Sequence, residues 1–405
     1  MNFSSRFPSE TSPNPIARLL EEKHHRGIPI VDLTHSNPTE AGFEYAMTEV
    51  MSAFQNQGML SYAPHPRGLS TARASIAAYY GRRGRAPDID RIHLTASTSE
   101  AYSFLLKLLA NPGDEILVAS PSYPLIEHLA GLESVLVRPF RLRYHEQSGW
   151  RIDRATLEDQ CGTRTRAVCV VNPNNPTGSY LHDEDMEYLA AFCSRNELAL
   201  ICDEVFYDYP IQPDVNRVST AGTDTQCLTF TLNGFSKLLA LPQMKLGWIV
   251  TDGPRELVHP ALDRLDFIAD AYLSVGTPVQ LAAERLFTTA ARMQETVRAR
   301  LILNAKALRE RFAVGQGLNA RRIEPLPVHG GWCGVLRVPS VQDELAFVLG
   351  LLDRGNVLVH PGYFFDFEAV GYFVVSLLTE CDAFRRGIDA LAGALEEKHL
   401  SIEPS

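Results

Sequence analysis

Residues 91–120, RIHLTASTSEAYSFLLKLLANPGDEILVAS, contain two short apolar runs separated by a stretch with apolar residues at helical spacing. The runs RIHLT and EILVAS lack polar alternation, as expected for strands buried on both faces of a largely parallel sheet. The stretch between them ends near Asn111 and Gly113, residue types that commonly end helices. The segment therefore predicts a strand, a helix and a second strand, the repeating unit of an α/β sheet.

The same alternation continues to residue 251, with five further apolar runs: SVLVRPF, AVCVVN, LALICDE, CLTFTL and LGWIVTD. We therefore expect an α/β protein whose large domain, residues 41–285, holds a mostly parallel seven-stranded sheet flanked by helices. A long helical pattern from about residue 278 precedes strand-like GVLRV and YFVVSLL and a closing helical stretch. These features predict a smaller α+β domain over residues 286–405, joined by the N-terminal segment 1–40.

Composition limits the classes of function. The chain has 405 residues, 45% of them hydrophobic and 21% charged, which is typical of a globular protein with a sizeable core. A formal net charge of −10 without a basic stripe argues against a nucleic-acid partner. The seven cysteines have no metal-ligand spacing, so we expect reduced thiols and no metal site. A polar, proline-rich N-terminal stretch and the lack of a membrane-length apolar run predict a cytoplasmic protein without a signal peptide or a membrane partner.

Polar residues follow several of the predicted strands. Ligands of open α/β sheets bind beyond the carboxyl ends of the strands, so these positions are informative. Ser97 and Glu100 form a capping box in which the helix begins at Thr98, and free N–H groups and hydroxyls at a helix N-terminus suit a phosphate. Tyr123 follows the next run, in the turn PSYP. Taken alone, the first feature is better explained as a plain helix cap and the second as a surface aromatic.

Three later strand ends add an amide loop, a carboxylate and an amine. The motif NPNNPTG carries Asn175 in a backbone that two prolines fix. Asp203 ends a buried strand, where burial raises a carboxylate's pKa unless a cation or donor holds it ionised. Lys237 follows the run CLTFTL within NGFSK. Together these groups are what pyridoxal phosphate requires: a phosphate site, a stacking ring, an amide donor, an acid and a Schiff-base amine.

The order of the motifs resembles that of a known family. STSEA, PSYP, NPNNPTG, DEV, NGFSK…KLGW and HPG, with Tyr62 and Gly68, resemble the class I/II aminotransferases, pyridoxal-phosphate-dependent enzymes of fold type I. The resemblance runs from about residue 15 to the C-terminus, and NGFSK is most similar to the alanine-aminotransferase-like branch. It implies a transaminase that moves an amino group between an amino acid, or a related amine, and a 2-oxo acid. A β-lyase, decarboxylase or racemase is the alternative, because the same lysine and cofactor ring serve all these reactions.

The resemblance also implies a role for each matched position. Lys237 is similar to the lysine that forms the Schiff base and later moves the α-proton, and Asp203 to the aspartate that keeps the ring nitrogen protonated. The other implied cofactor contacts are ring stacking by Tyr123, a bond from Asn175 to the phenolic oxygen, and phosphate binding by Ser97, Thr98, Ser99, Ser236 and Lys245. Tyr62 resembles a tyrosine contributed across a dimer interface, which implies a homodimer. The substrate-binding residues implied are Ser36, Asn37 and Asn175.

Four positions depart from the family pattern. Phe206 stands where a tyrosine is usual, so either Tyr207, one residue later, reaches the phenolic oxygen or that bond is missing; we expect no full replacement. Lys245 replaces an arginine, which keeps the charge and loses the two-pronged geometry. The N-terminal loop THSNPTE differs from the usual Gly-Asp-Pro or Gly-Asn-Pro turn. The fourth departure is Val374, at the position of the arginine that grips the substrate α-carboxylate.

Two explanations of Val374 are open. Another cation could replace the arginine, with the candidates Arg385, Arg386, Arg337, Arg18 and Arg26. Alternatively, the substrate lacks an α-carboxylate where the family has one. A cofactor-binding regulator with a fused DNA-binding domain is a further alternative, which the short segment before the predicted large domain disfavours.

Overall fold

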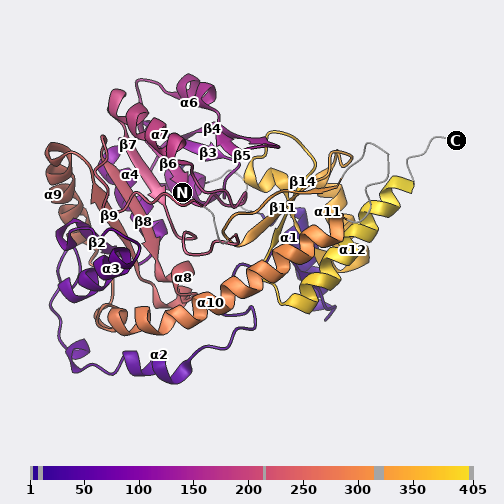
Figure 1. Cartoon of the computed structure of the whole chain (residues 1–405), viewed down its shortest axis with the longest axis horizontal. Coiled ribbons are helices and arrows are strands. Elements are labelled where there is room, and N and C mark those ends of the chain that lie inside the picture. Colours follow the sequence, from indigo (N-terminus) through magenta and orange to yellow (C-terminus); the bar gives the residue numbers. More distant parts are fainter. Residues whose placement is uncertain (1–2, 8–11, 213–215, 314–322, 401–405) are drawn as a thin grey trace.

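A computed structural model describes residues 3–7, 12–212, 216–313 and 323–400, and its main feature is an eight-stranded sheet (Figure 1). The strand order is β2-β9-β8-β7-β6-β3-β4-β5. Seven strands coincide with the predicted apolar runs: β2 (Ile92–Thr95), β3 (Glu115–Ser120), β4 (Leu136–His145), β6 (Thr165–Val171), β7 (Ala199–Asp203), β8 (Thr229–Gly234) and β9 (Gly247–Asp252). The predicted strand count is one too low. The strand β5 (Gly149–Ile152) was missed because it is a short edge strand with alternating burial and no continuous apolar run.

The sheet is mostly parallel, as predicted. Strands β4, β3, β6, β7 and β8 pair in parallel, whereas β9 runs antiparallel between β8 and β2, and β5 antiparallel to β4. Alternate residues of β3 enter different cores: Ile116 and Val118 pack with one set of helices, and Leu117 and Ala119 with another. Helices therefore cover both faces of the sheet, which explains why its strands show no polar alternation.

The helices of the large-sheet region divide between these faces and the outer surface. The first core contains residues of α4 (Thr98–Leu109), α5 (Leu125–Leu132) and α9 (Arg255–Tyr272); the second contains residues of α6 (Arg154–Gln160) and α7 (Asp183–Arg195). A third apolar cluster joins α3 (Ser70–Arg82), α8 (Phe235–Leu238) and the first part of α10 (Thr277–Ala313). Short elements complete this region: α2 (Met47–Ala53), η1 (Gln57–Leu60), η2 (Ile89–Arg91) and η3 (Pro242–Met244).

A second, four-stranded antiparallel sheet is built from the C-terminal part of the chain. Its order is β10-β11-β14-β13, and its strands are β10 (Glu324–Pro325), β11 (Cys333–Arg337), β14 (Tyr372–Ser376) and β13 (His360–Pro361). The elements around it are α11 (Glu344–Gly355), η4 (Gly362–Phe365) and α12 (Cys381–Leu400). The N-terminal segment joins this region: α1 (Pro15–His25) contacts α11, and β1 (Val31–Asp32) pairs with β12 (Val357–Leu358).

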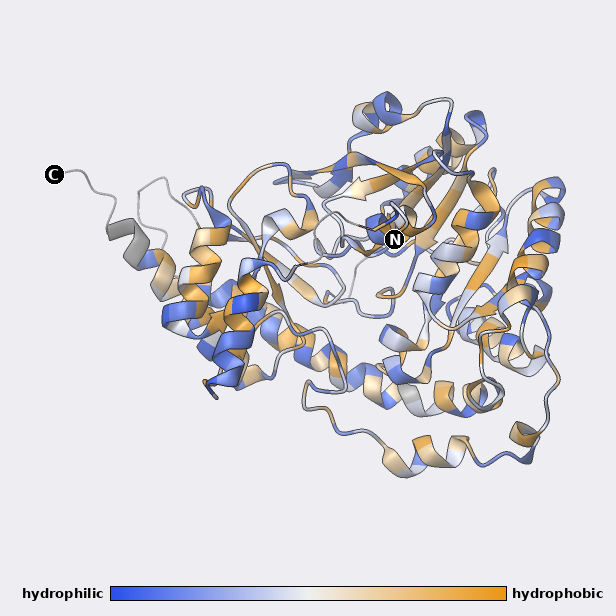
Figure 2. Cartoon of the chain, turned by 180° about the vertical axis from the view of Figure 1, so that it is seen from behind, coloured by the Kyte–Doolittle hydropathy of each residue, from blue (hydrophilic) through white to orange (hydrophobic). Residues whose placement is uncertain are grey.

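Helix α10 (Thr277–Ala313) runs from the large sheet to the small one (Figure 1). It passes through residue 285 without interruption, so the boundaries predicted near residues 40 and 285 stay a prediction. Apolar residues are concentrated in the strands, whereas α10 and α12 alternate apolar and polar residues (Figure 2). Within the described ranges, no helix combines the length and apolarity that crossing a bilayer requires.

Candidate active site

A cavity of about 400 Å³ lies at the carboxyl ends of the parallel strands, between the two sheets. The large sheet and its loops contribute one wall, here called the large-sheet wall, formed by Ser97, Thr98, Ser99, Tyr123, Asn175, Asp203, Ser236, Lys237 and Lys245. The opposite wall, here called the small-sheet wall, is formed by Trp332, Cys333, His360, Phe365, Val374 and Ser376. Within the large-sheet wall, residues as far apart in the sequence as Ser97 and Lys245, 148 positions, thus come together, as the strand-end argument predicts.

Lys237 enters the cavity from the short helix α8, which begins directly after β8. Its Nζ donates to the carbonyl oxygen of Ser36 at 3.4 Å and lies 4.9 Å from the centroid of the Trp332 ring. Burial lowers the pKa of the Lys237 ammonium, because the surroundings solvate a charge poorly. Lys237 is therefore more readily neutral, and the neutral amine is the form that acts as a nucleophile or base.

Asp203 is the last residue of β7 and is buried. The Val205 N–H donates to Asp203 Oδ1 at 3.1 Å, and no lysine, arginine or histidine among the described residues forms an ion pair with this carboxylate. Burial raises the pKa of Asp203 to about 6. A buried carboxylate without a cation that faces a cavity fits a ligand with a protonated nitrogen, which would hold it ionised.

The N-terminus of α4 forms an anion-binding position. Ser97 caps the helix, accepting from the Glu100 N–H at 3.1 Å, while Glu100 accepts from the Ala96 N–H at 2.6 Å. The predicted cap and the start at Thr98 are confirmed, and the first N–H groups of the helix remain free for a ligand. Gly247 of β9 lies so close that a Cβ there would be 2.9 Å from the Ser97 carbonyl carbon. Lys245 lines the same cavity, so this end of it fits a phosphate.

Asn175 is oriented by a residue that no sequence motif singles out. The thiol of Cys333 donates to Asn175 Oδ1 at 3.5 Å, which leaves the amide N–H groups available to the cavity. Burial raises the pKa of the Cys333 thiol to about 12, so it stays a neutral donor. Cys333 begins β11 in the small-sheet region, and only the packing of the two regions brings it to the NPNNPTG loop.

Tyr207 points away from the cavity, whereas Phe206 lines it. The guanidinium carbon of Arg83 lies 3.5 Å from the centroid of the Tyr207 ring, and the Tyr207 hydroxyl donates to the carbonyl oxygen of Arg217 at 2.9 Å. Arg83 in turn pairs with the buried Glu204 at 2.9 Å. The cation holds the tyrosine in this network, and the hydroxyl does not reach the cavity that would hold the phenolic oxygen.

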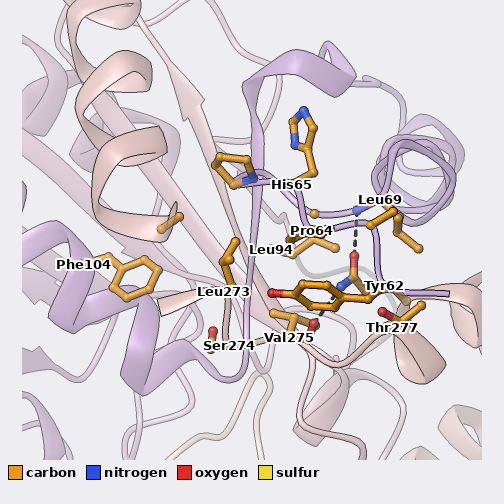
Figure 3. Close-up of a pocket in the computed structure, with 15 residues that line it drawn as sticks. Tyr62, Pro64, His65, Leu69, Leu94, Phe104, Leu273, Ser274, Val275 and Thr277 are labelled. Carbon is orange, nitrogen blue, oxygen red and sulfur yellow. Dashed lines mark hydrogen bonds between the residues drawn. The ribbon is translucent and has the colours of Figure 1, made fainter. Parts of the chain in front are cut away.

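Two predicted site residues lie outside the cavity. The Asn37 side-chain oxygen accepts from the Thr39 N–H at 3.1 Å and from the Thr39 hydroxyl at 2.8 Å, a local turn that keeps Asn37 away from the cavity lining. Its neighbour Ser36 does line the cavity. Tyr62 is 80% exposed and lines a separate small pocket with Leu69, Leu273 and Thr277 (Figure 3).

Val374 lies in the small-sheet wall, and none of the five candidate arginines lines the cavity. Arg337 pairs with Glu324, Arg385 with Asp382, and Arg26 with Glu22. Arg18 belongs to α1 and Arg386 to α12. In the single chain, therefore, none of these five cations takes the place of the missing arginine at the cavity.

A lysine, a buried carboxylate without an ion pair and an anion-binding helix terminus lie at one edge of this α/β sheet, and this set of groups suits pyridoxal phosphate. The family described as aminotransferase class I and II matches residues 28–382, and the chain belongs to this family. Pyridoxal 5′-phosphate is its cofactor, and the residues of the large-sheet wall fit that group.

Individual relatives extend this result. The chain is 30% identical to the arginine–pyruvate transaminase AruH of Pseudomonas aeruginosa, with 80% of each protein covered. It is 29% identical to the alanine aminotransferase of Mycobacterium tuberculosis over 66% of this chain and 62% of that protein, so it spans less than two thirds of that relative. The fold is similar to the alanine aminotransferase from Pyrococcus furiosus, with a TM-score of 0.86, 22% identity and coverage of 98% of this chain and 100% of the other.

Proposed function

We propose that the protein is a pyridoxal-phosphate-dependent transaminase that moves an amino group between an amino acid, or a related amine, and a 2-oxo acid. The observation that carries the proposal is that Lys237 and Asp203 face one cavity beside the N-terminus of α4. The names of similar proteins, alanine aminotransferase and arginine–pyruvate transaminase among them, support the same reaction type.

Each cofactor group has a partner in the large-sheet wall. Lys237 would hold the aldehyde carbon and Asp203 the ring nitrogen. Asn175 would donate to the phenolic oxygen, and Tyr123 would lie against the ring. The phosphate would be held by Ser97, Thr98, Ser99, Ser236 and Lys245. When bound, the cofactor withdraws electrons from the substrate carbon that carries the amino group.

Lys237 has two tasks in this proposal. It would hold the cofactor covalently, and its free amine would move a proton from the substrate carbon. Its lowered pKa favours the neutral amine that both tasks require. The Ser36 carbonyl and the Trp332 ring limit the directions in which the side chain can point. Asp203 stays ionised once it faces a protonated ring nitrogen.

The expected assembly is a homodimer in which Tyr62 completes the phosphate site of the partner subunit. Several large apolar side chains on α2, η1 and α9 are exposed in the single chain: Met47, Met51, Leu60 and Phe267. Exposed apolar surface of this kind is typical of protein–protein contacts. A cytoplasmic location, and the absence of nucleic-acid and membrane partners, complete the proposal.

Borohydride reduction of the cofactor-loaded protein tests the central assignment. The reduced cofactor should be found on the peptide that contains Lys237, and Lys237→Ala should lose the covalent label while its circular dichroism spectrum is unchanged. Label on Lys245 or on another lysine would contradict the assignment. Transamination itself is tested by single-turnover conversion of the bound cofactor to its amino form with a panel of amines and amino acids.

A further inference from the structure

The two walls of the cavity differ in charge. The large-sheet wall carries two ammonium groups, Lys237 and Lys245, and the carboxylate of Asp203. The small-sheet wall, within the described residues that line the cavity, carries no lysine, arginine or acid. Its two titratable groups are neutral near pH 7, because burial lowers the pKa of His360 and raises that of Cys333 to about 12.

Among the described residues that line the cavity, no cation besides Lys237 and Lys245 remains for a substrate anion. In the proposed function Lys237 holds the cofactor's aldehyde carbon and Lys245 its phosphate. Two further arginines of the described chain bind neutral oxygens: Arg141 donates to Ser120 Oγ at 3.1 Å, and Arg300 donates to the carbonyl oxygens of Ala41 and Leu378. Neither of them lines the cavity.

Val374 lies within an apolar cluster. It pairs across the small sheet with Val335 on one side and with His360 on the other. Its side chain is fully buried and packs in a cluster with Trp150, Leu326, Val335 and Phe365. A carboxylate placed against this wall would lose water without gaining a cation, whereas an apolar group would gain from the same burial.

We infer that the amino donor carries a neutral, apolar substituent, and no carboxylate, on the carbon that bears its amino group. The inference rests on the transaminase reaction of the proposed function and narrows its donor to an amine without a carboxylate. Because donor and acceptor would bind against the same wall in turn, the same argument narrows the acceptor to an aldehyde or a ketone without a carboxylate beside its carbonyl carbon. A donor R–CH2–NH2 would leave as R–CHO, while the cofactor's aldehyde group becomes an aminomethyl group. The donor carbon loses the two electrons that the cofactor carbon gains, so the exchange needs no further oxidant.

Equilibrium binding measures how the charge of a ligand affects its affinity at nearly constant shape, and it requires no turnover. Titration calorimetry on the cofactor-loaded protein would compare unreactive, nearly isosteric pairs: 3-phenylpropanamide with 3-phenylpropionate, and butyramide with butyrate. We expect a neutral ligand to bind at least about tenfold more tightly than its carboxylate partner, because only the carboxylate is desolvated without a cation. If no neutral ligand binds more tightly than its carboxylate partner, the inference is wrong.

Val374→Arg reverses the expected preference, with Val374→Ile as the control that adds volume without charge. Val374→Arg should improve binding of 3-phenylpropionate at least about tenfold through a charge-assisted pair, and Val374→Ile should keep the wild-type preference. Equal gains in the two variants would overturn the charge argument. Where Val374→Arg does not fold, the wild-type ligand pairs decide alone.

Single-turnover spectra distinguish failure of this inference from failure of the proposed function. We expect 2-phenylethylamine and isobutylamine to convert the bound cofactor to its amino form faster than phenylalanine and valine do. The opposite order would overturn the inference and leave the transaminase proposal standing. If neither class of donor converts the cofactor, the transaminase proposal fails, and the inference that rests on it fails too.

Discussion

The two walls of the cavity come from different parts of the chain and have opposite character. The large-sheet wall presents ionisable and hydrogen-bonding side chains at the ends of buried strands, whereas the small-sheet wall presents Trp332, Phe365 and Val374. The first wall holds the groups that we assign to the cofactor, and in the proposed function the second wall would lie against the substrate. In that proposal, reaction type and substrate choice would depend on separate regions of this molecule.

The largest expected effect comes from removing the amine of Lys237 from the large-sheet wall. Lys237→Ala should lower the single-turnover rate by about three or more orders of magnitude, because covalent attachment and proton transfer both depend on this group. Rapid-mixing spectroscopy with the best donor measures the rate, and Lys107→Ala, a change of a surface lysine on α4, provides the control. Near wild-type turnover in Lys237→Ala would show that Lys237 is not a catalytic residue.

Asp203 should also make the cofactor-free protein sensitive to pH. Its folded-state pKa of about 6 lies above its ordinary value of 3.8, so the native state binds the proton more tightly than the unfolded state. Stability should therefore fall as pH rises from about 4 to 6, by up to about 3 kcal/mol from this group alone. Urea denaturation at several pH values tests this, and Asp203→Asn should flatten that part of the profile. A profile that Asp203→Asn leaves unchanged would contradict the raised pKa.

A somewhat smaller effect is expected when the carboxylate is removed from the loaded protein. Asp203→Ala should still bind the cofactor through its phosphate but lose a charge-assisted hydrogen bond of about 1.5–3 kcal/mol, equivalent to a rate loss of about ten- to a hundredfold. Single-turnover rates at saturating cofactor measure the loss. A rate equal to that of the wild type would mean that Asp203 does not act on the ring nitrogen.

The smallest expected effect comes from Tyr207, which packs against Arg83 outside the cavity. Tyr207→Phe should leave the spectral pH titration of the bound cofactor unchanged and cost only about 0.5–1.5 kcal/mol of stability, through the lost bond to the Arg217 carbonyl. Phe206→Tyr, by contrast, adds a hydroxyl to the cavity lining and should shift that titration. The reverse pattern, with a strong shift in Tyr207→Phe alone, would make Tyr207 the donor to the phenolic oxygen.

The sequence alone determined most of the large sheet and the main residues of the large-sheet wall. Seven continuous apolar runs predicted seven strands, because strands buried on both faces require such runs, and β5 was missed because its burial alternates. Lys237 and Asp203 could be singled out because Asp203 ends the buried strand β7 and Lys237 comes shortly after the buried strand β8, and parallel strands end at one edge. These features are local, so a single pass along the chain reveals them.

Only the tertiary structure decided which side chains meet across the cavity. The thiol of Cys333 contacts Asn175 from a strand 158 residues later, and Tyr207 turns outward because Arg83, far earlier in the chain, holds its ring. That no cation among the described residues lies beside Val374 became clear only from the structure, because it shows candidate arginines in ion pairs elsewhere. Such contacts depend on long-range packing and on competition between partners, which spacing in the sequence does not record.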